Sequence, residues 1–266
     1  MTARCCPSVA DLKADKGKGQ KTMLRYFSLD EAAAAEAAEI DIASVPPDLV
    51  AHPRYREVAP SIFSMTGKSH IEAGTADDYL RFAGQMLQAG ADALYCSASL
   101  QTVEYLTREY VPIVGHVGLV PSRATFTGGF RAVGKTADTA IALFHKCRRY
   151  QEAGAFAVEI EVVPVEVATA ISARLDILLW SMGAGPGCDA QYLFAEDILG
   201  ENRSHLPRHA KVYRNFAAEY DRLQAERIAA FTEFRSDVAK GAFPEARNVV
   251  TMDRHEHESF LKGIGG

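Results

Sequence analysis

The chain has 266 residues, 48% of them hydrophobic and 24% charged, which is the composition of an ordinary globular protein with one large domain or two small ones. Its formal net charge of −5 argues against a nucleic acid or an anionic membrane as partner, and no apolar run approaches the roughly 20 residues of a membrane span. Because the opening residues lack the apolar core of a secretory signal and the five cysteines form no disulfide pattern, we expect a cytoplasmic protein.

Short apolar segments alternate with amphipathic ones and predict eight strands, most of them followed by a helix. The predicted strands are residues 21–27, 40–45, 61–65, 91–97, 111–119, 155–163, 176–183 and 191–195. Helices are predicted from Ser28, where Glu31 completes a capping box, from Thr75 and from Thr136. Further along, residues 208–241 are typical of one long helix.

This alternation predicts an α/β fold, a single (β/α)8 barrel over residues 1–266 with a covering tail from about 241 to 266. The alternative, a doubly wound open sheet, requires a glycine fingerprint after the first strand, and "RYFSLDEA" has no glycine there. In a barrel the chemistry lies at the C-terminal ends of the strands, and we place the opening residues there as well.

The glycine-rich stretch "SMGAGPGCDAQ", residues 181–191, follows the seventh predicted strand. It matches neither the phosphate-binding pattern G-x-x-x-x-G-K-[ST] nor the dinucleotide pattern G-x-G-x-x-G, because no lysine follows and no helix signal opens there. We therefore expect a loop whose backbone approaches another group closely.

Glu159 and Glu161 lie two residues apart in the otherwise apolar "AVEIEVVP" and so share one face of a strand. Two neighbouring buried carboxylates favour a proton on one of them, which suits proton transfer. Alternatively, Glu159 faces the helix layer and pairs with a basic residue. His116 in "VGHVGL" is equally compatible with a ligand contact and with a structurally satisfied histidine.

Small polar residues end the fourth predicted strand in "YCSAS". We expect Cys96 to be a buried, inert thiol, since no histidine is near it in the sequence. Ser97 and Ser99 are candidates for ligand binding or for capping the next helix, and capping is favoured for Ser99. The alternating "HEHE" at 255–258 is more typical of a solvated tail than of a metal site.

Five segments resemble the ketopantoate hydroxymethyltransferase family in order and spacing, most strongly over residues 85–250: "VPIVGHVGLVPSRATFTGGFRAVGKT", "EAGAFAVEIEVVPVEVA", "GAGPGCDAQYLFAEDILG", "HAKVYRNF" and "GAFPEARN". The resemblance implies a barrel of the phosphoenolpyruvate/pyruvate superfamily type, assembled as a homo-oligomer, usually a decamer. It also implies hydroxymethyl transfer from 5,10-methylenetetrahydrofolate to 2-oxoisovalerate, towards pantothenate, with Mg²⁺ stabilising an enolate. Glu161 then corresponds to the catalytic proton-transfer residue and His116 to a substrate contact.

The departures from the family pattern fall on its metal ligands. Where the family has acids on the second, third and fourth strands, this chain has Pro47, then Pro60 or Ser61, and then Ser97. Loss of all three acids removes the Mg²⁺ site as the family builds it, so we expect no metal ligands and a remodelled, metal-free site.

Other groups must then hold the negative charge of an enolate or contact the substrate. The candidates are Arg25 at the end of the first strand, Tyr95 at the family's lysine position, and Glu159 at a position usually apolar in the family, besides Ser97 and His116. For the first three, surface pairing and packing are the alternatives.

We expect an enzyme, a hydroxymethyltransferase or aldolase-like transferase, that makes or breaks a carbon–carbon bond next to the carbonyl of a small 2-keto acid. The alternatives are a metal-independent lyase, hydrolase or tautomerase acting on another small carboxylate, and a catalytically silent paralogue that binds a ligand or assembles with active subunits.

Overall fold

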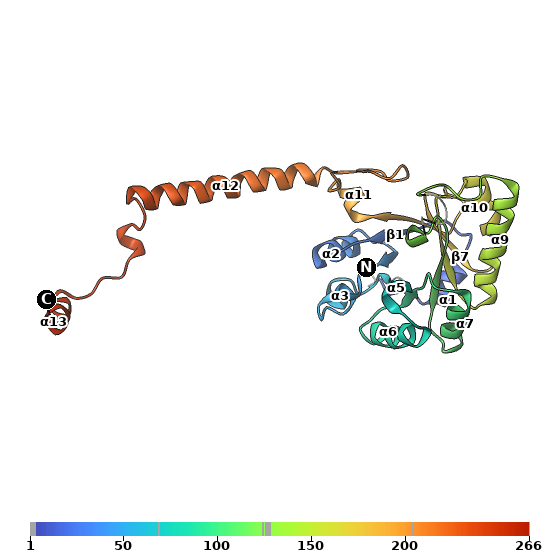
Figure 1. The fold of residues 1–266 in the computed structure, drawn as a ribbon, viewed down its shortest axis with the longest axis horizontal. Coiled ribbons are helices and arrows are strands. Elements are labelled where there is room, and N and C mark those ends of the chain that lie inside the picture. Colours follow the sequence, from blue (N-terminus) through green and yellow to red (C-terminus); the bar gives the residue numbers. More distant parts are fainter. Residues whose placement is uncertain (1–3, 69, 124, 126–128, 204, 266) are drawn as a thin grey trace. The chain divides into compact units, whose positions relative to one another are not determined.

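The computed structural model describes residues 4–68, 70–123, 125, 129–203 and 205–265. Eight parallel strands close into a barrel in the order of the chain (Figure 1). They are β1 (Lys21–Arg25), β2 (Ile42–Ser44), β3 (Phe63–Gly67), β4 (Ala93–Tyr95), β5 (Ile113–Gly118), β6 (Ala157–Glu161), β7 (Leu178–Met182) and β8 (Ala190–Phe194). The predicted (β/α)8 barrel is confirmed.

Most strands are followed by helices on the outside of the barrel. The α-helices of the first 200 residues are α1 (Val9–Ala14), α2 (Leu29–Ala37), α3 (Pro47–Val50), α4 (Tyr55–Val58), α5 (His70–Ala73), α6 (Ala76–Gln88), α7 (Leu100–Arg108), α9 (Ala137–Glu152), α10 (Val165–Ser172) and α11 (Ala195–Leu199). Thr75 forms a capping box with Asp78, and Ser28 caps α2 by accepting the Glu31 N–H. The predicted capping box at Ser28 is wrong, because the Glu31 carboxylate accepts from the Phe27 N–H and not from that of Ser28.

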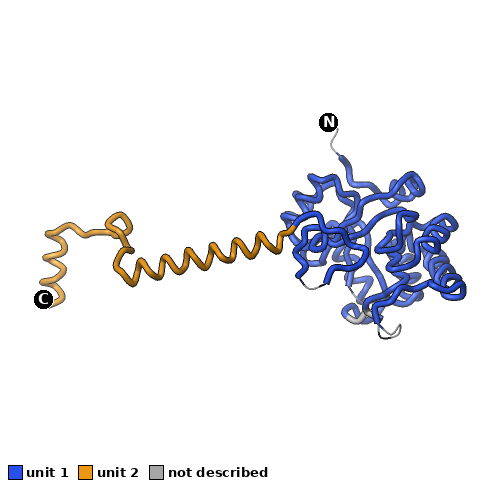
Figure 2. The backbone as a smooth tube through the Cα atoms, turned by 90° about the horizontal axis from the view of Figure 1, so that it is seen from above, with its two compact units in different colours: residues 1–214 blue, residues 215–266 orange. Residues whose placement is uncertain are grey.

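The chain divides into two units, residues 1–214 and residues 215–266 (Figure 2). The second unit contains α12 (Phe216–Lys240) and α13 (Arg254–Gly263), neither of which has a buried residue. The prediction that the long helix begins at residue 208 is wrong: it begins at Phe216, because the side chain of Asn215 accepts the Ala218 N–H at 3.2 Å and caps it. The single domain with a covering tail from about 241 stays a prediction.

Within the described part of the chain, no helix combines the length and the apolar character that a membrane span requires.

Alternate strand residues point into the barrel, and those near the N-terminal ends of the strands form its inner core. This core contains Met23, Ile42, Phe63, Met65, Ala93, Val114, Ala157, Leu178, Trp180 and Ala190. Leu12 of α1 packs into the same cluster and closes the N-terminal end of the barrel. The prediction that the opening residues lie with the chemistry is therefore wrong, because burial of Leu12 holds them at the opposite end.

The glycine-rich stretch joins β7 directly to its parallel neighbour β8 through residues 183–189, a fully described segment without a helix. A Cβ atom at Gly187 would lie 2.0 Å from Thr169 Oγ1, and one at Gly185 would lie 2.4 Å from Val165 Cγ2, both on α10. Glycine is needed so that this backbone can lie against α10. The predicted close approach is confirmed, and the approached group is the protein's own helix.

Candidate active site

All six residues predicted to form the site line one cavity at the C-terminal ends of the strands. The cavity has a volume of about 340 Å³. Its predicted lining residues are Arg25, Tyr95, Ser97, His116, Glu159 and Glu161. They come from the ends of β1, β4, β5 and β6, which is where a barrel of this kind places its chemistry. Their catalytic and binding roles stay predictions.

His116 lies between the two glutamates. Its Nδ1 atom is 3.1 Å from Glu159 Oε2, and its Nε2 atom is 3.1 Å from Glu161 Oε2. The parallel register pairs His116 with Glu159 on β6, and both side chains point into the barrel. The alternative in which Glu159 faces the helix layer is therefore wrong, because the inward face of β6 is the one that carries both acids.

This arrangement makes His116 a cation at neutral pH. Burial lowers the pKa of His116, but hydrogen bonds to Glu159 and Glu161 and their negative charges outweigh it and raise the pKa to about 9. Nε2 also lies 2.7 Å from the carbonyl oxygen of Leu119, which can only accept a hydrogen bond. Nε2 therefore carries a proton in either charge state, and Nδ1 is the atom that gains or loses one.

The Tyr95 hydroxyl lies 3.0 Å from His116 Nδ1. Burial, together with the charge of Glu159, raises the pKa of Tyr95 well above its usual value, so the phenol keeps its proton. When His116 is an imidazolium, its Nδ1–H donates, and the Tyr95 oxygen must accept. The Tyr95 O–H is then available to donate to a ligand in the cavity.

Arg25 supplies a second cation from the end of β1. Its guanidinium donates to the Ser44 hydroxyl at 2.9 Å and lies 5.3 Å from the ring centre of Phe27 and 5.7 Å from that of Phe194. Stacking on two rings holds a planar guanidinium in one orientation. Arg25 is thereby suited to bind a carboxylate of a ligand.

Sequence reasoning missed several residues of the site. The cavity is also lined by Ser44, Gly67, Lys68, Glu72, Pro121, Met182, Tyr192 and Phe194. The inward alternation of β8 would have indicated Tyr192 and Phe194. His209, in the segment "HAKVYRNF", was assigned no role from the sequence. Burial lowers the pKa of His209, while the charges of Glu161 and Asp197 act in the opposite direction, so His209 lies near Glu161.

The donor set at the ends of β2, β3 and β4 does not fit Mg²⁺. Mg²⁺ prefers carboxylate oxygens in octahedral geometry, whereas these strands end in the Ser44 hydroxyl, Gly67 and Tyr95, and the Arg25 cation already binds Ser44. No group of three or more His, Cys, Asp or Glu residues that could hold a metal occurs in the described ranges. Pro60 and Ser61, the expected place of the third family acid, precede β3, whose C-terminal end is Gly67, and none of the three is an acid.

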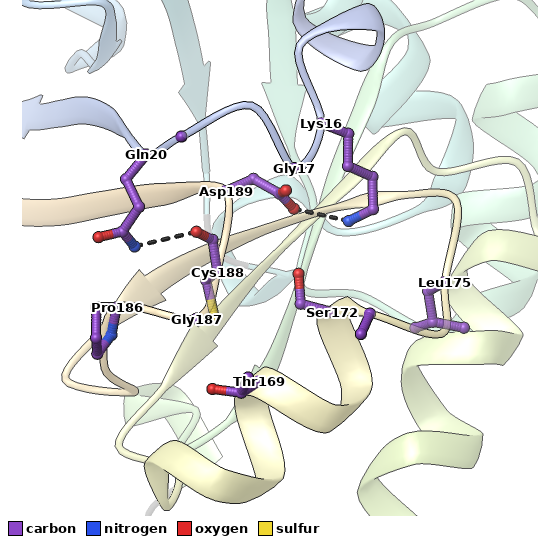
Figure 3. Close-up of a pocket in the computed structure, with 12 residues that line it drawn as sticks. Lys16, Gly17, Gln20, Thr169, Ser172, Leu175, Pro186, Gly187, Cys188 and Asp189 are labelled. Atoms are coloured by element: carbon purple, nitrogen blue, oxygen red, sulfur yellow. Dashed lines mark hydrogen bonds and ion pairs between the residues drawn. The ribbon is translucent and has the colours of Figure 1, made fainter.

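A second cavity, of about 450 Å³, lies beside the glycine-rich connection (Figure 3), and neither Glu159 nor Glu161 lines it. Polar groups of this cavity already pair with each other. Lys16 Nζ lies 2.8 Å from Asp189 Oδ2, and the neutral Gln20 amide donates to the Cys188 carbonyl at 3.0 Å. Although this cavity is larger, the clustered titratable groups make the first one the candidate active site.

Two smaller predictions at the end of β4 are confirmed. Cys96 is fully buried, and burial raises its pKa to about 11, which makes the thiol unreactive. Ser99 caps α7 by accepting the Thr102 N–H at 3.2 Å.

Comparison with protein families gives one clear match. The family model of ketopantoate hydroxymethyltransferase matches residues 68–246. A 3-methyl-2-oxobutanoate hydroxymethyltransferase of Hyperthermus butylicus is 39% identical over 196 residues, which cover 73% of this chain and 65% of the relative. The enzyme of that name from Halalkalibacterium halodurans is 34% identical over 222 residues, 81% of this chain and 77% of the relative. The chain thus spans about two thirds to three quarters of these relatives.

Solved structures share the fold at low sequence identity. Oxaloacetate acetylhydrolase superposes with a TM-score of 0.56 at 11% identity, covering 90% of this chain and 98% of the other. 2,3-Dimethylmalate lyase, a member of the phosphoenolpyruvate mutase/isocitrate lyase superfamily, gives 0.51 at 12% identity, covering 97% and 99%. These likenesses confirm the barrel type and carry nothing about the reaction.

Proposed function

The chain belongs to the ketopantoate hydroxymethyltransferase family, and from this premise we propose that it makes or breaks a carbon–carbon bond next to the carbonyl of a small 2-keto acid. Hydroxymethyl transfer to 2-oxoisovalerate is the first candidate reaction. The observation that carries the proposal is the convergence of Arg25, Tyr95 and Glu161 on one cavity at the C-terminal ends of the strands. Because the donor set does not fit Mg²⁺, the reaction in this proposal uses no divalent cation.

The substrate carboxylate binds to Arg25 by charge-assisted hydrogen bonds, and the two rings beside the guanidinium keep that contact fixed. Glu161 is placed to take the C3 proton. Its Oε2 atom accepts from His116, which leaves Oε1 for the substrate.

As the C3–H bond breaks, its electron pair forms the C2–C3 double bond, and the carbonyl π electrons move onto the C2 oxygen. The Tyr95 O–H donates to that oxygen, since the imidazolium of His116 donates to Tyr95. Protein donors thus hold the enolate charge that Mg²⁺ holds in the family scheme. 5,10-Methylenetetrahydrofolate as the one-carbon donor, the step towards pantothenate, cytoplasmic location and a decameric assembly all follow from the family alone.

The same enolate also serves a lyase or tautomerase that does not use folate. The silent paralogue is an outcome of the test below.

The test is exchange of the C3 proton of 2-oxoisovalerate in D₂O, followed by proton NMR with EDTA and with added Mg²⁺. The wild type should exchange in both buffers, and Glu161→Gln should exchange at least about 100-fold more slowly. Glu152→Gln, an exposed position on α9, is the matched control. Exchange that requires Mg²⁺ would contradict the metal-free site, and no exchange in either buffer would contradict an enolising enzyme.

A further inference from the structure

One oxygen of the buried acids in the site has no partner. Glu159 is 3% exposed, its Oε2 atom lies beside His116, and its Oε1 atom has no hydrogen-bond partner. A buried polar atom without a partner costs about 1–3 kcal/mol, more when it is charged, so native proteins seldom keep one without a use.

None of the described side chains around Glu159 donates a hydrogen bond to its Oε1 atom. The single Nδ1 proton of His116 already faces Glu159 Oε2 and the Tyr95 oxygen. The Tyr192 hydroxyl interacts with Ser44 and Arg25. Because Glu159 lines the cavity, a ligand bound there can supply the missing donor.

We propose that Glu159 Oε1 binds and deprotonates a substrate hydroxyl, so that the protein cleaves 4-hydroxy-2-oxo acids into an aldehyde and a shorter 2-oxo acid without folate. The inference rests on the proposed function, because it uses the same enolate and the same Arg25 contact. It adds a second proton-transfer group with a different target: Glu161 acts at carbon and Glu159 acts at oxygen.

The cleavage balances within the cavity. The hydroxyl proton moves to Glu159 Oε1, and the O–H electron pair forms the C4=O bond of the aldehyde. The C3–C4 bond breaks, and its electron pair gives the enolate whose oxygen accepts from Tyr95. C3 then receives a proton that Glu161 passes on from water, and Glu159 releases its proton to water, so the protein ends with as many protons as it began with.

His116 completes the cycle as a positioning residue. It lies 3.1 Å from each carboxylate, through a different ring nitrogen in each case. These two contacts hold both carboxylates in place while His116 keeps its Nε2 proton, and each carboxylate exchanges its own proton with water in the cavity.

The charges of the site agree with a substrate of this kind. Arg25 and His116 contribute two cations, and Glu159 and Glu161 contribute two anions, all within one cavity. A hydroxy acid brings one carboxylate for Arg25 and one neutral donor for Glu159. A second carboxylate at Glu159 would instead place two anions together.

The test uses 4-hydroxy-3,3-dimethyl-2-oxobutanoate as substrate and measures formaldehyde release without folate. The wild type should release formaldehyde, and Glu159→Gln should do so at least about 100-fold more slowly, while C3 exchange of 2-oxoisovalerate falls less than tenfold. Glu159→Asp, which keeps a carboxylate, should recover part of the cleavage, and circular dichroism checks the fold of each variant. Glu166→Gln, exposed on α10, is the control.

A second measurement is independent of catalysis. The wild type should bind the hydroxy acid at least about tenfold more tightly than its deoxy analogue, 3,3-dimethyl-2-oxobutanoate, and Glu159→Gln should lose that preference. Equal loss of cleavage and exchange in Glu159→Gln, with no preference in binding, overturns the inference. C3 exchange without any cleavage by the wild type overturns it too, but leaves the proposed function standing. Absence of both reactions overturns the proposed function.

Discussion

The cavity is lined by two arcs of the barrel that differ in charge. From β5 and β6 come His116, Glu159 and Glu161, which hold one another in a buried cluster. From β1 and β2 come Arg25 and Ser44, a cation and a neutral hydroxyl joined by a hydrogen bond. The family resemblance implies proton transfer at Glu161 in the first arc and metal ligands on the second, third and fourth strands, of which β2 belongs to the second arc. The comparison teaches that the arc expected to transfer protons carries the acids, whereas the arc that includes one expected metal position carries a cation.

The largest expected effect on this contrast comes from removing the cation of the second arc, Arg25. Replacing Arg25 with glutamine should weaken binding of 2-oxoisovalerate by about 10- to 100-fold, because a charge-assisted hydrogen bond contributes about 1.5–3 kcal/mol. Isothermal titration calorimetry measures the dissociation constant. Arg148→Gln, exposed on α9, should bind as the wild type does. Unchanged affinity in Arg25→Gln would show that the second arc does not recognise the carboxylate.

The first arc can be tested through its histidine, His116. The pKa of His116 in the folded protein is about 9, above the usual 6.5. The stabilisation that comes from protonated His116 is therefore fully present below about pH 6.5, and it is lost as the pH rises through 9. The free energy of unfolding should therefore fall by on the order of 2 kcal/mol between pH 6.5 and 9. Urea denaturation at a series of pH values measures it.

His116→Gln should flatten that profile, whereas His145→Gln, an exposed position on α9, should keep it. A wild-type profile that is flat or rises over this range would contradict a protonated His116.

A substitution in the connection between β7 and β8, next to the first arc, should have a smaller effect on stability. Gly187→Ala should destabilise the fold by about 1–3 kcal/mol, because its Cβ would meet the Thr169 side chain on α10. Thermal unfolding measures the difference. Gly84→Ala in α6, where a Cβ meets nothing within 4 Å, should be neutral or stabilising. Equal stabilities of the two variants would show that the connection does not depend on α10.

The smallest effect concerns the metal. Saturating 2-oxoisovalerate at 100 times its dissociation constant should raise stability by about 2.7 kcal/mol, a clear shift of the melting temperature. Replacing EDTA with Mg²⁺ should change that shift by less than about 1 °C. A shift that appears only with Mg²⁺ would make the second arc a metal site after all.

The sequence predicted the strand order and the place of the site, because in a barrel the ends of strands identify the chemical face. It did not predict which way Glu159 points. The period of two places Glu159 and Glu161 on one face, but only closure of the barrel decides that this face is the inner one.

Other features depended on tertiary contacts that local patterns do not carry. Leu12 belongs to a short helix whose place at the N-terminal end follows from packing against Met23 and its neighbours. The third strand was predicted at 61–65 and lies at Phe63–Gly67, so its C-terminal end was placed two residues too early. Tyr192 received no role from the sequence, because its strand is apolar; it is buried in the inner core and also lines the cavity.

The connection between β7 and β8 bears on how relatives of this chain are recognised. Gly185 and Gly187 are required by contact with α10, and Gly183 by contact with His209, so packing within the protein accounts for all three. A member of the family can therefore keep these glycines while substitutions in the second arc change the reaction that it catalyses. Across such relatives, bulk at position 187 should vary together with bulk at position 169, and neither should follow the identity of the substrate.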